Sequence, residues 1–319
     1  MTTLTKKPLN RYLFWGAVLL ILLGCAIYLQ AAAEQTNPRA DFWRLVRNGV
    51  PGYTSVSSDG HSVLIQNGGE NWRELRNLVI INITPWVIGL ALVAMGLFHL
   101  VVGGDKLQEP RTGKMIERYK GWEIALHWYT AVLFIILALT GLSILLGRGQ
   151  LIALFGHEGF AAYLALAKII HNWSGPPFLA GVFLQGLVWY RDNIPRKRDL
   201  LWFKNMGGMI GSGPRPPTGK INAGEKGWFW LMIISSIAVG VTGFLLDFPI
   251  WGQDRLVMQV SAGIHAVMGV VFITASFGHI YMGSVGAEGA FESMVHGKVD
   301  IAWAKQHADL WLEEKRKEE

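Results

Sequence analysis

The sequence predicts an all-α integral membrane protein. Of its 319 residues, 51% are hydrophobic and only 16% are charged. Long uncharged stretches alternate with short basic ones, and the uncharged stretches reach the length of about 20 residues that a helix needs to cross a bilayer. We therefore expect a four-helix transmembrane bundle preceded by two additional N-terminal transmembrane segments. The expected spans are residues 12–33, 78–102, 124–146, 169–190, 228–246 and 260–282.

The N-terminal part has one element with two interpretations. The first span follows Lys6, Lys7 and Arg11 and ends in small residues, so residues 1–33 are either a cleavable signal peptide or an uncleaved anchor helix. Residues 34–77 are polar and rich in turn signals, which predicts an outward-facing, periplasmic segment. The next divisions are a second transmembrane helix at 78–102, an exposed cytoplasmic linker at 103–121, the four-helix bundle at 122–284 and a cytoplasmic tail at 285–319.

The positive charges predict an orientation. An N-terminus on the inside places most of the 29 Lys and Arg residues on one side, in the linker, the 191–227 loop and the tail. This asymmetry indicates a bacterial inner-membrane protein with both termini in the cytoplasm, unless the first segment is cleaved. It also explains the net charge of +6 without a nucleic-acid partner. Cys25 is the single cysteine, so the chain has neither an internal disulfide nor its own cysteine-held Fe–S cluster.

Histidines inside the spans are the first functional signal. Polar side chains are costly in lipid, so each is a candidate site residue, although a lone histidine can simply hydrogen-bond a neighbouring helix. Of the nine histidines, five lie in or at the edge of expected spans: His99, His127, His171, His265 and His279.

Spacing sorts these histidines into pairs. Fourteen positions separate His265 from His279, so on one helix they lie within about 40° of the same face and about 21 Å apart along the axis. His171 opens the outward end of the fourth span, at the depth of His265. His127 opens the inward end of the third span, at the depth of His279.

Two imidazoles at each of two depths predict axial ligands for two b-type haem irons, and hence a four-helix transmembrane di-haem cytochrome b bundle. Zinc would require a tighter cluster of ligands. His99 is an alternative to His127 at the inner haem. Gly141, Gly181 and Gly269 would let a porphyrin approach the backbone. The other four histidines are expected on the solvated surface: His61, His157, His296 and His307.

A polar loop precedes the inward end of the fifth span. Asn222 and Glu225 are able to hydrogen-bond a quinone carbonyl and to relay protons. The alternative is a helix cap, in which Asn222 and Glu225 form a capping box. Spacing alone favours the cap and leaves the quinone site open.

From about Lys114 onward, the chain resembles the gamma subunit, the cytochrome b, of membrane-bound formate dehydrogenase. The resemblance covers about two thirds of the chain, and the N-terminal span with its outer segment is an addition relative to four-helix members. The stretches that carry it occur in order: Ile116-Glu-Arg-Tyr-Lys, Ala125-Leu-His-Trp, Arg191-Asp-Asn-Ile-Pro-Arg-Lys-Arg-Asp, Ile221-Asn-Ala-Gly-Glu-Lys, Ile264-His-Ala, Gly278-His-Ile-Tyr-Met, Glu292-Ser-Met-Val-His-Gly-Lys-Val and Trp303-Ala-Lys.

The resemblance implies the same haem pairing and a quinone site that includes Asn222, Gly224 and His279. Glu225 stands where the family pattern has glutamine, so the proton relay differs in detail. The implied partners are an Fe–S beta subunit and a molybdenum or tungsten alpha subunit that oxidises formate. Electrons would pass through both haems to menaquinone or ubiquinone, reduced at the cytoplasmic side, in anaerobic respiration. No catalytic residue for formate oxidation itself is expected in this chain.

Three other functions agree with the same residues. The chain would serve a nickel hydrogenase or another molybdoenzyme with the same haem chemistry and a different electron donor. In a different class, it would be a transporter whose membrane histidines relay protons or bind a metal. A purely structural anchor for an outward-facing enzyme is the third.

Overall fold

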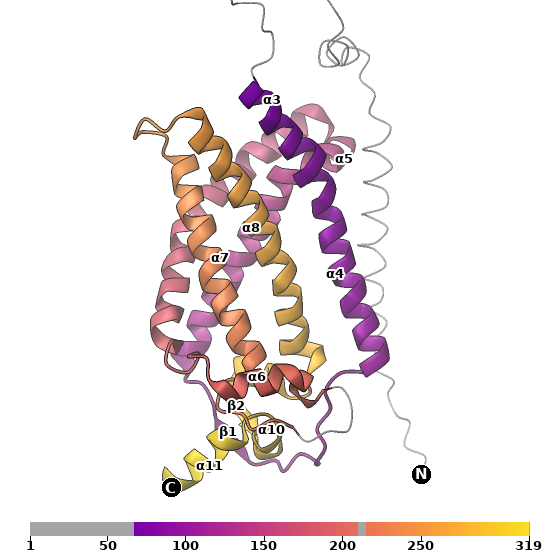
Figure 1. Cartoon of the computed structure of the whole chain (residues 1–319), viewed down its shortest axis with the longest axis vertical. Helices are drawn as coiled ribbons and strands as arrows, with labels where there is room; N and C mark the ends of the chain where they lie inside the picture. The colour runs from indigo at the N-terminus through magenta and orange to yellow at the C-terminus, as the bar shows by residue number, and fades with distance from the viewer. Residues whose placement is uncertain (1–66, 210–214, 319) are drawn as a thin grey trace, which may run out of the picture. The chain divides into compact units, whose positions relative to one another are not determined.

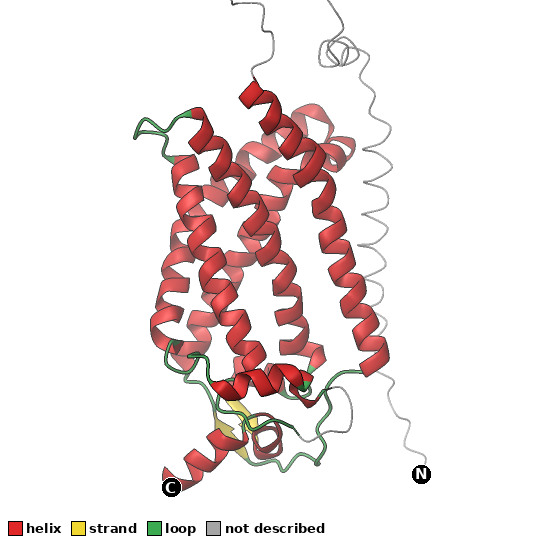
Figure 2. Cartoon of the chain, viewed as in Figure 1, coloured by secondary structure: helices red, strands yellow, loops and turns green. Residues whose placement is uncertain are grey.

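The computed structural model describes residues 67–209 and 215–318. These residues are mostly helical (Figure 2). The strands β1 (Met115–Glu117) and β2 (Lys298–Asp300) form one short antiparallel pair, in which Ile116 lies opposite Val299. The expected first span and most of the 34–77 segment lie outside the described residues.

Four helical stretches of the described chain are long and apolar enough to cross a membrane. They confirm the prediction of an all-α membrane protein. The first stretch joins α3 (Asn67–Glu74), the π-helix η1 (Leu75–Ile80) and α4 (Ile81–Val102). The other three contain α5 (Gly121–Trp189), α7 (Ala223–Asp247) and α8 (Arg255–Tyr281).

Helix α5 contains both the third and the fourth expected span. Gly156 interrupts it with φ 70° and ψ 177°, a conformation that glycine adopts at little cost and that no helix continues through. The chain therefore forms two helical arms, one on each side of Gly156. The loop that we expected between these spans is itself helical up to this break.

The described chain packs as two units. One contains residues 67–89 and 145–163, where the rings of Phe155 and Tyr163 lie 5.8 Å apart. The other, which we call the bundle unit, contains residues 90–144, 164–209 and 215–318. All the candidate site residues that the structure describes lie in the bundle unit.

Both arms of α5 pack with α7 and α8 in the bundle unit (Figure 1). Asn222 caps the start of α7, and Asp254 caps the start of α8 by accepting a 2.8 Å hydrogen bond from the Val257 amide. The buried indole of Trp189 donates a 2.8 Å hydrogen bond to Glu123, which joins the ends of the two arms of α5. The buried core between the helices includes Tyr119, Phe178, Val182, Trp189, Ile221, Phe229, Met232 and Phe272.

A small subdomain closes the end of the bundle at which α7 begins, which we call the tail end (Figure 1). It contains the β1–β2 pair and a second core formed around Val299 and Trp303. Its helices and turns are α6 (Lys197–Lys204), η2 (Met206–Gly208), η3 (Met282–Gly286), α9 (Ala290–His296), α10 (Ile301–His307) and α11 (Asp309–Glu318).

Most of the 103–121 linker is exposed, as we expected, but the linker is also held against the tail. The Asp300 carboxylate accepts hydrogen bonds from the amides of Thr112, Gly113 and Ala302, which fixes the linker to the tail. Burial alone would raise the pKa of Asp300, but these hydrogen bonds to the charged form lower it. The linker is buried at Asp105 and Arg118 because the tail packs over it.

Gly297 makes the turn between α9 and β2 with φ +72°. Its carbonyl accepts hydrogen bonds from the amides of Arg118 and Tyr119, at 2.7 and 3.0 Å. An added Cβ would lie 2.2 Å from the Tyr119 carbonyl oxygen, so this position excludes every side chain.

We expect Gly297→Ala to lower the apparent melting temperature of the detergent-solubilised protein. The left-handed backbone alone costs an alanine about 1–2 kcal/mol, and the overlap with Tyr119 adds to this cost. Gly113→Ala is the matched control, because Gly113 has a similar φ of +73° and nothing within 4 Å of its added Cβ. Equal melting temperatures for the two variants would contradict the role assigned to this turn.

Candidate functional site

The structure brings four of the five span histidines together in two pairs. His171 on the second arm of α5 faces His265 on α8, with ring centroids 6.0 Å apart. His127 on the first arm faces His279 on α8, at 6.3 Å. Helix α8 thus supplies one member of each pair, as the spacing of its histidines predicts.

Both separations fit an iron ion between two imidazoles. Two metal–imidazole bonds of about 2 Å each place the ring centroids roughly 6 Å apart. A direct hydrogen bond between the rings of a pair would bring them closer than this. The described residues contain no group of three or more His, Cys, Asp or Glu side chains that would hold a metal ion directly. The donor set therefore fits a haem, whose porphyrin supplies the other four ligands.

Two threonines orient the rings of the His171–His265 pair, which we call the far pair. The Thr140 hydroxyl donates to the Ile136 carbonyl at 2.7 Å and lies 2.9 Å from His171 Nδ1. A hydroxyl has one hydrogen, so the threonine oxygen must accept from an Nδ1–H of His171. The lone pair of the ring is then on Nε2, the nitrogen left available to a metal.

His265 is held in the same way from α7. Thr242 Oγ1 lies 3.1 Å from His265 Nδ1, and its hydroxyl donates to the Ala238 carbonyl at 2.6 Å. The two threonines thus fix the same tautomer in both members of the far pair. Sequence reasoning missed both, because a threonine in an apolar span gives no sign of which neighbouring helix it faces.

Glycines make room for these rings. An added Cβ at Gly141 or at Gly243 would lie 3.1 Å from Cε1 of His171 or of His265, respectively. An added Cβ at Gly269 would have no neighbour within 4 Å, whereas Gly181 lets Thr130 and Tyr129 pack closely. Gly243 was not among the glycines that we expected.

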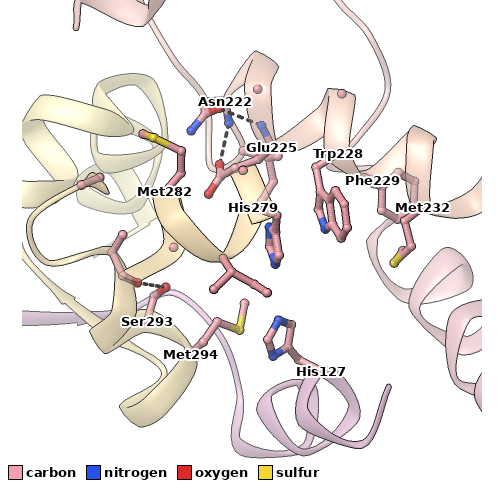
Figure 3. Close-up of a pocket in the computed structure, with 18 of the residues that line it drawn as sticks. His127, Asn222, Glu225, Trp228, Phe229, Met232, His279, Met282, Ser293 and Met294 are labelled. Carbon is pink, nitrogen blue, oxygen red and sulfur yellow. Dashed lines mark hydrogen bonds between the residues drawn. The ribbon is translucent and has the colours of Figure 1, made fainter. Parts of the chain in front are cut away.

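The pair at the tail end is framed by aromatic rings. His279 stacks on Trp228 with centroids 4.5 Å apart and an interplanar angle of 7°. His127 meets Trp128 edge to face at 5.3 Å. Figure 3 shows the His127 and His279 rings pointing toward each other, with Trp228 beside them. His127 Nδ1 is buried and has no hydrogen-bond partner among the described residues.

A cavity of about 700 Å³ is lined by these two rings and by residues of the small subdomain at the tail end. Its inner walls are apolar and include Phe134, Phe178 and Phe272, whereas its tail end is polar. A mostly apolar cavity with a few converging polar groups is typical of a site for a small organic ligand. All three residues of the predicted quinone site line it: Asn222, Gly224 and Glu225.

The capping box that we weighed against a quinone site is formed. Asn222 Oδ1 accepts from the Glu225 amide at 2.9 Å, and the Glu225 carboxylate accepts from the Asn222 amide at 2.9 Å (Figure 3). Gly224 is required by packing, because its Cβ would lie 2.8 Å from the Trp202 ring. The same residues thus begin α7 and line the cavity.

An arginine that sequence reasoning missed joins this loop to the linker. Arg118 binds both carboxylate oxygens of Glu225 at 2.9 and 3.1 Å and donates to the Lys220 carbonyl at 2.7 Å. Burial alone would lower the pKa of Arg118, but the charge of Glu225 raises it, so the guanidinium stays charged. Arg118 therefore fixes the position of the Glu225 side chain, which lines the cavity.

The remaining histidines differ in their surroundings. His99 Nδ1 lies 3.0 Å from the Tyr281 hydroxyl, while His127 rather than His99 faces His279. His157 and His296 are exposed as expected, and His61 lies outside the described residues. The expectation for His307 was wrong: its ring stacks on Trp303 at 4.9 Å, and its side chain is only 11% exposed. Packing of α10 against the linker buries it.

Several known proteins are similar to this chain in sequence. The nitrate-inducible formate dehydrogenase cytochrome b556(Fdn) subunit of Escherichia coli strain K12 is 30% identical over 211 residues, which are 65% of this chain and 94% of that protein. The formate dehydrogenase cytochrome b556(fdo) subunit of the same strain is 29% identical, covering 63% of this chain and 94% of that protein. The formate dehydrogenase cytochrome b556 subunit of Haemophilus influenzae is 26% identical, over 59% and 78%.

The sequence profile of the prokaryotic cytochrome b561 family matches residues 118–297. This region is more than half of the chain and contains all four paired histidines. The chain therefore belongs to the prokaryotic cytochrome b561 family and is a membrane-bound b-type cytochrome.

Proposed function

We propose that this cytochrome b is the membrane subunit of a formate dehydrogenase complex. It would receive electrons from a partner Fe–S subunit and pass them through two b haems to a quinone reduced at the cytoplasmic side. The observation that carries this proposal is the two pairs of histidines along α8, of which the His127–His279 pair lines the cavity described above. The names of the similar proteins support formate as the donor.

The assigned ligands are His171 with His265 for one haem and His127 with His279 for the other. A haem held by two imidazoles would supply one-electron transfer rather than oxygen binding. Thr140 and Thr242 orient the far pair for this purpose. Trp228 holds the ring of His279 beside the cavity.

The tail end faces the cytoplasm in this proposal, and the protein lies in the bacterial inner membrane. The basic linker and loop support this orientation, because positive charge is enriched on the cytoplasmic side. The domain divisions follow from it: a periplasmic 34–77 segment, a bundle at 122–284 and cytoplasmic segments at 103–121 and 285–319.

Quinone reduction takes place in the cavity beside His279. Asn222 and Glu225 supply polar groups at its mouth, while the aromatic walls exclude water from the ring of the substrate. Menaquinone and ubiquinone both fit this chemistry. Formate would be oxidised on a molybdenum or tungsten subunit of the complex.

Purification of the intact complex tests the choice of donor. We expect an Fe–S subunit and a molybdenum or tungsten subunit to copurify, and formate to reduce the haems. Reduction by hydrogen, or copurification of a nickel-containing subunit, would instead assign the chain to a hydrogenase. A purified protein without a Soret band would support a transporter.

His265→Ala and His279→Ala should each remove one haem. An iron with a single imidazole binds weakly, so the haem-to-protein ratio should fall by about half in either variant, as measured by pyridine haemochrome assay. Quinone reduction should be lost in both. His296→Ala is the control, because His296 is exposed and should leave the spectrum unchanged. Full haem content and activity in both variants would favour a structural anchor.

Thr242→Val should weaken the far haem site specifically. Valine keeps the shape of threonine but cannot accept the hydrogen bond from His265 Nδ1, and loss of such a bond typically costs about 10–100-fold in metal affinity. The haem retained after competition with apomyoglobin measures this change. Thr130→Val is the control, since Thr130 bonds only to the Leu126 carbonyl among the hydrogen bonds described for it. Identical retention in both variants would contradict the ligand assignment.

Asn222→Ala should raise the KM for quinone about tenfold while haem content stays unchanged. Asp254→Ala is the control for the loss of a helix cap. It removes the cap of α8, which lowers the stability of the helix by about 1 kcal/mol. Asp254 does not line the cavity, so its variant should keep the wild-type KM. Equal KM values for the two variants would mean that Asn222 acts only as a cap.

A further inference from the structure

His307 is a buried titratable group that the roles assigned above do not use. It ends α10, and its ring lies flat against Trp303 at an interplanar angle of 29°. Nε2 is buried and has no hydrogen-bond partner among the described residues, yet the side chain lines the cavity. A buried nitrogen without a partner is costly, so this position has a use beyond packing.

On its other side, His307 meets an acid held by an arginine. Nδ1 lies 3.7 Å from Asp105 Oδ2, and Asp105 forms a bidentate ion pair with Arg215, one bond of which is 2.8 Å. Asp105 belongs to the linker, Arg215 to the segment 215–222 and His307 to α10. All three line the cavity.

The ring is therefore placed between two environments. Nδ1 faces Asp105, and 11% of the side chain is exposed, whereas Nε2 is enclosed. An imidazole can accept a proton at one nitrogen and release one from the other, which suits it to carry protons through a wall. A ring that served only for packing on Trp303 would not require the carboxylate.

We infer that His307, with Asp105 beside it, is the proton-entry group of the quinone cavity. This inference rests on the proposed function. A quinone accepts two electrons, which the Fe–S partner supplies through the haems, and two protons from the cytoplasm to become a quinol. Each proton passes from solvent to His307 and then into the cavity. Asn222, Glu225 and the His127–His279 pair line the same cavity as His307.

The charges around His307 keep it ready to accept a proton. Burial is the largest cause that lowers its pKa to about 4; Arg215 and Arg118 also lower it, while Asp105 and Glu225 raise it. These groups approach from the linker, the segment 215–222 and α7, and Trp303 is the neighbour on α10 itself. The ring is thus neutral at pH 7, and one of its nitrogens has a lone pair that can accept a proton.

The test uses the purified complex with its haems reduced by dithionite and mixed with a soluble naphthoquinone. In His307→Gln we expect haem reoxidation to slow by about tenfold or more, with an unchanged KM and haem spectrum. The rate should rise as the pH falls, and the solvent isotope effect should increase, because proton entry now limits the reaction. In His307→Ala, added imidazole should restore much of the rate.

His296→Gln is the matched control, because His296 is an exposed histidine of the same tail, and it should keep the wild-type rate at every pH. A wild-type rate in His307→Gln at all pH values would overturn the inference alone. A slow His307→Gln with no change in pH profile or isotope effect would also overturn it, as a purely structural role. Haems that quinone fails to reoxidise in the wild-type complex would overturn the proposed function, and the inference with it.

Discussion

The structure depends on keeping two imidazoles about 6 Å apart, twice, inside a helical bundle. Side chains in a packed core normally close such gaps, since contact is favourable and voids are costly. Here rings at 6.0 and 6.3 Å face each other across gaps that the surrounding residues maintain. Glycines at 141 and 243 and threonines at 140 and 242 are best understood as means of keeping the far pair open and aligned.

The two ends of the bundle hold their histidine rings in different ways. At the far end, both rings are fixed by threonine hydroxyls. At the tail end, His279 is held instead by stacking on Trp228, and His127 has a buried nitrogen without a partner. Stacking fixes the plane of a ring without using a hydrogen bond. The cavity also lies at the tail end, where polar groups converge. The pair whose rings are not fixed by threonine hydroxyls is thus the pair that lines the cavity.

The sequence was sufficient for the pairing because it follows from helical geometry. Fourteen residues on one helix place His265 and His279 on one face, and the order of the spans gives each its partner. The hydroxyl partners were out of reach, because their contacts depend on the rotation of α7 and of the first arm of α5. His307 was misjudged for a related reason: a short polar tail gives no periodic signal, and its burial comes from the linker, about two hundred residues earlier in the chain. The helical continuation of α5 toward Gly156 was missed because loop and helix residues are mixed there.

The attachment of the tail to the linker has a consequence for the order in which the parts of the chain fold during synthesis. Asp300 and α10 follow α8 in the chain, so they leave the ribosome after every helix that carries a paired histidine. Until they are made, Asp105 and Arg118 lack their cover, and the tail end of the bundle stays open. The order of synthesis thus provides an interval in which a large planar cofactor would have a route to the His127–His279 pair, and folding of the last segment then closes that route.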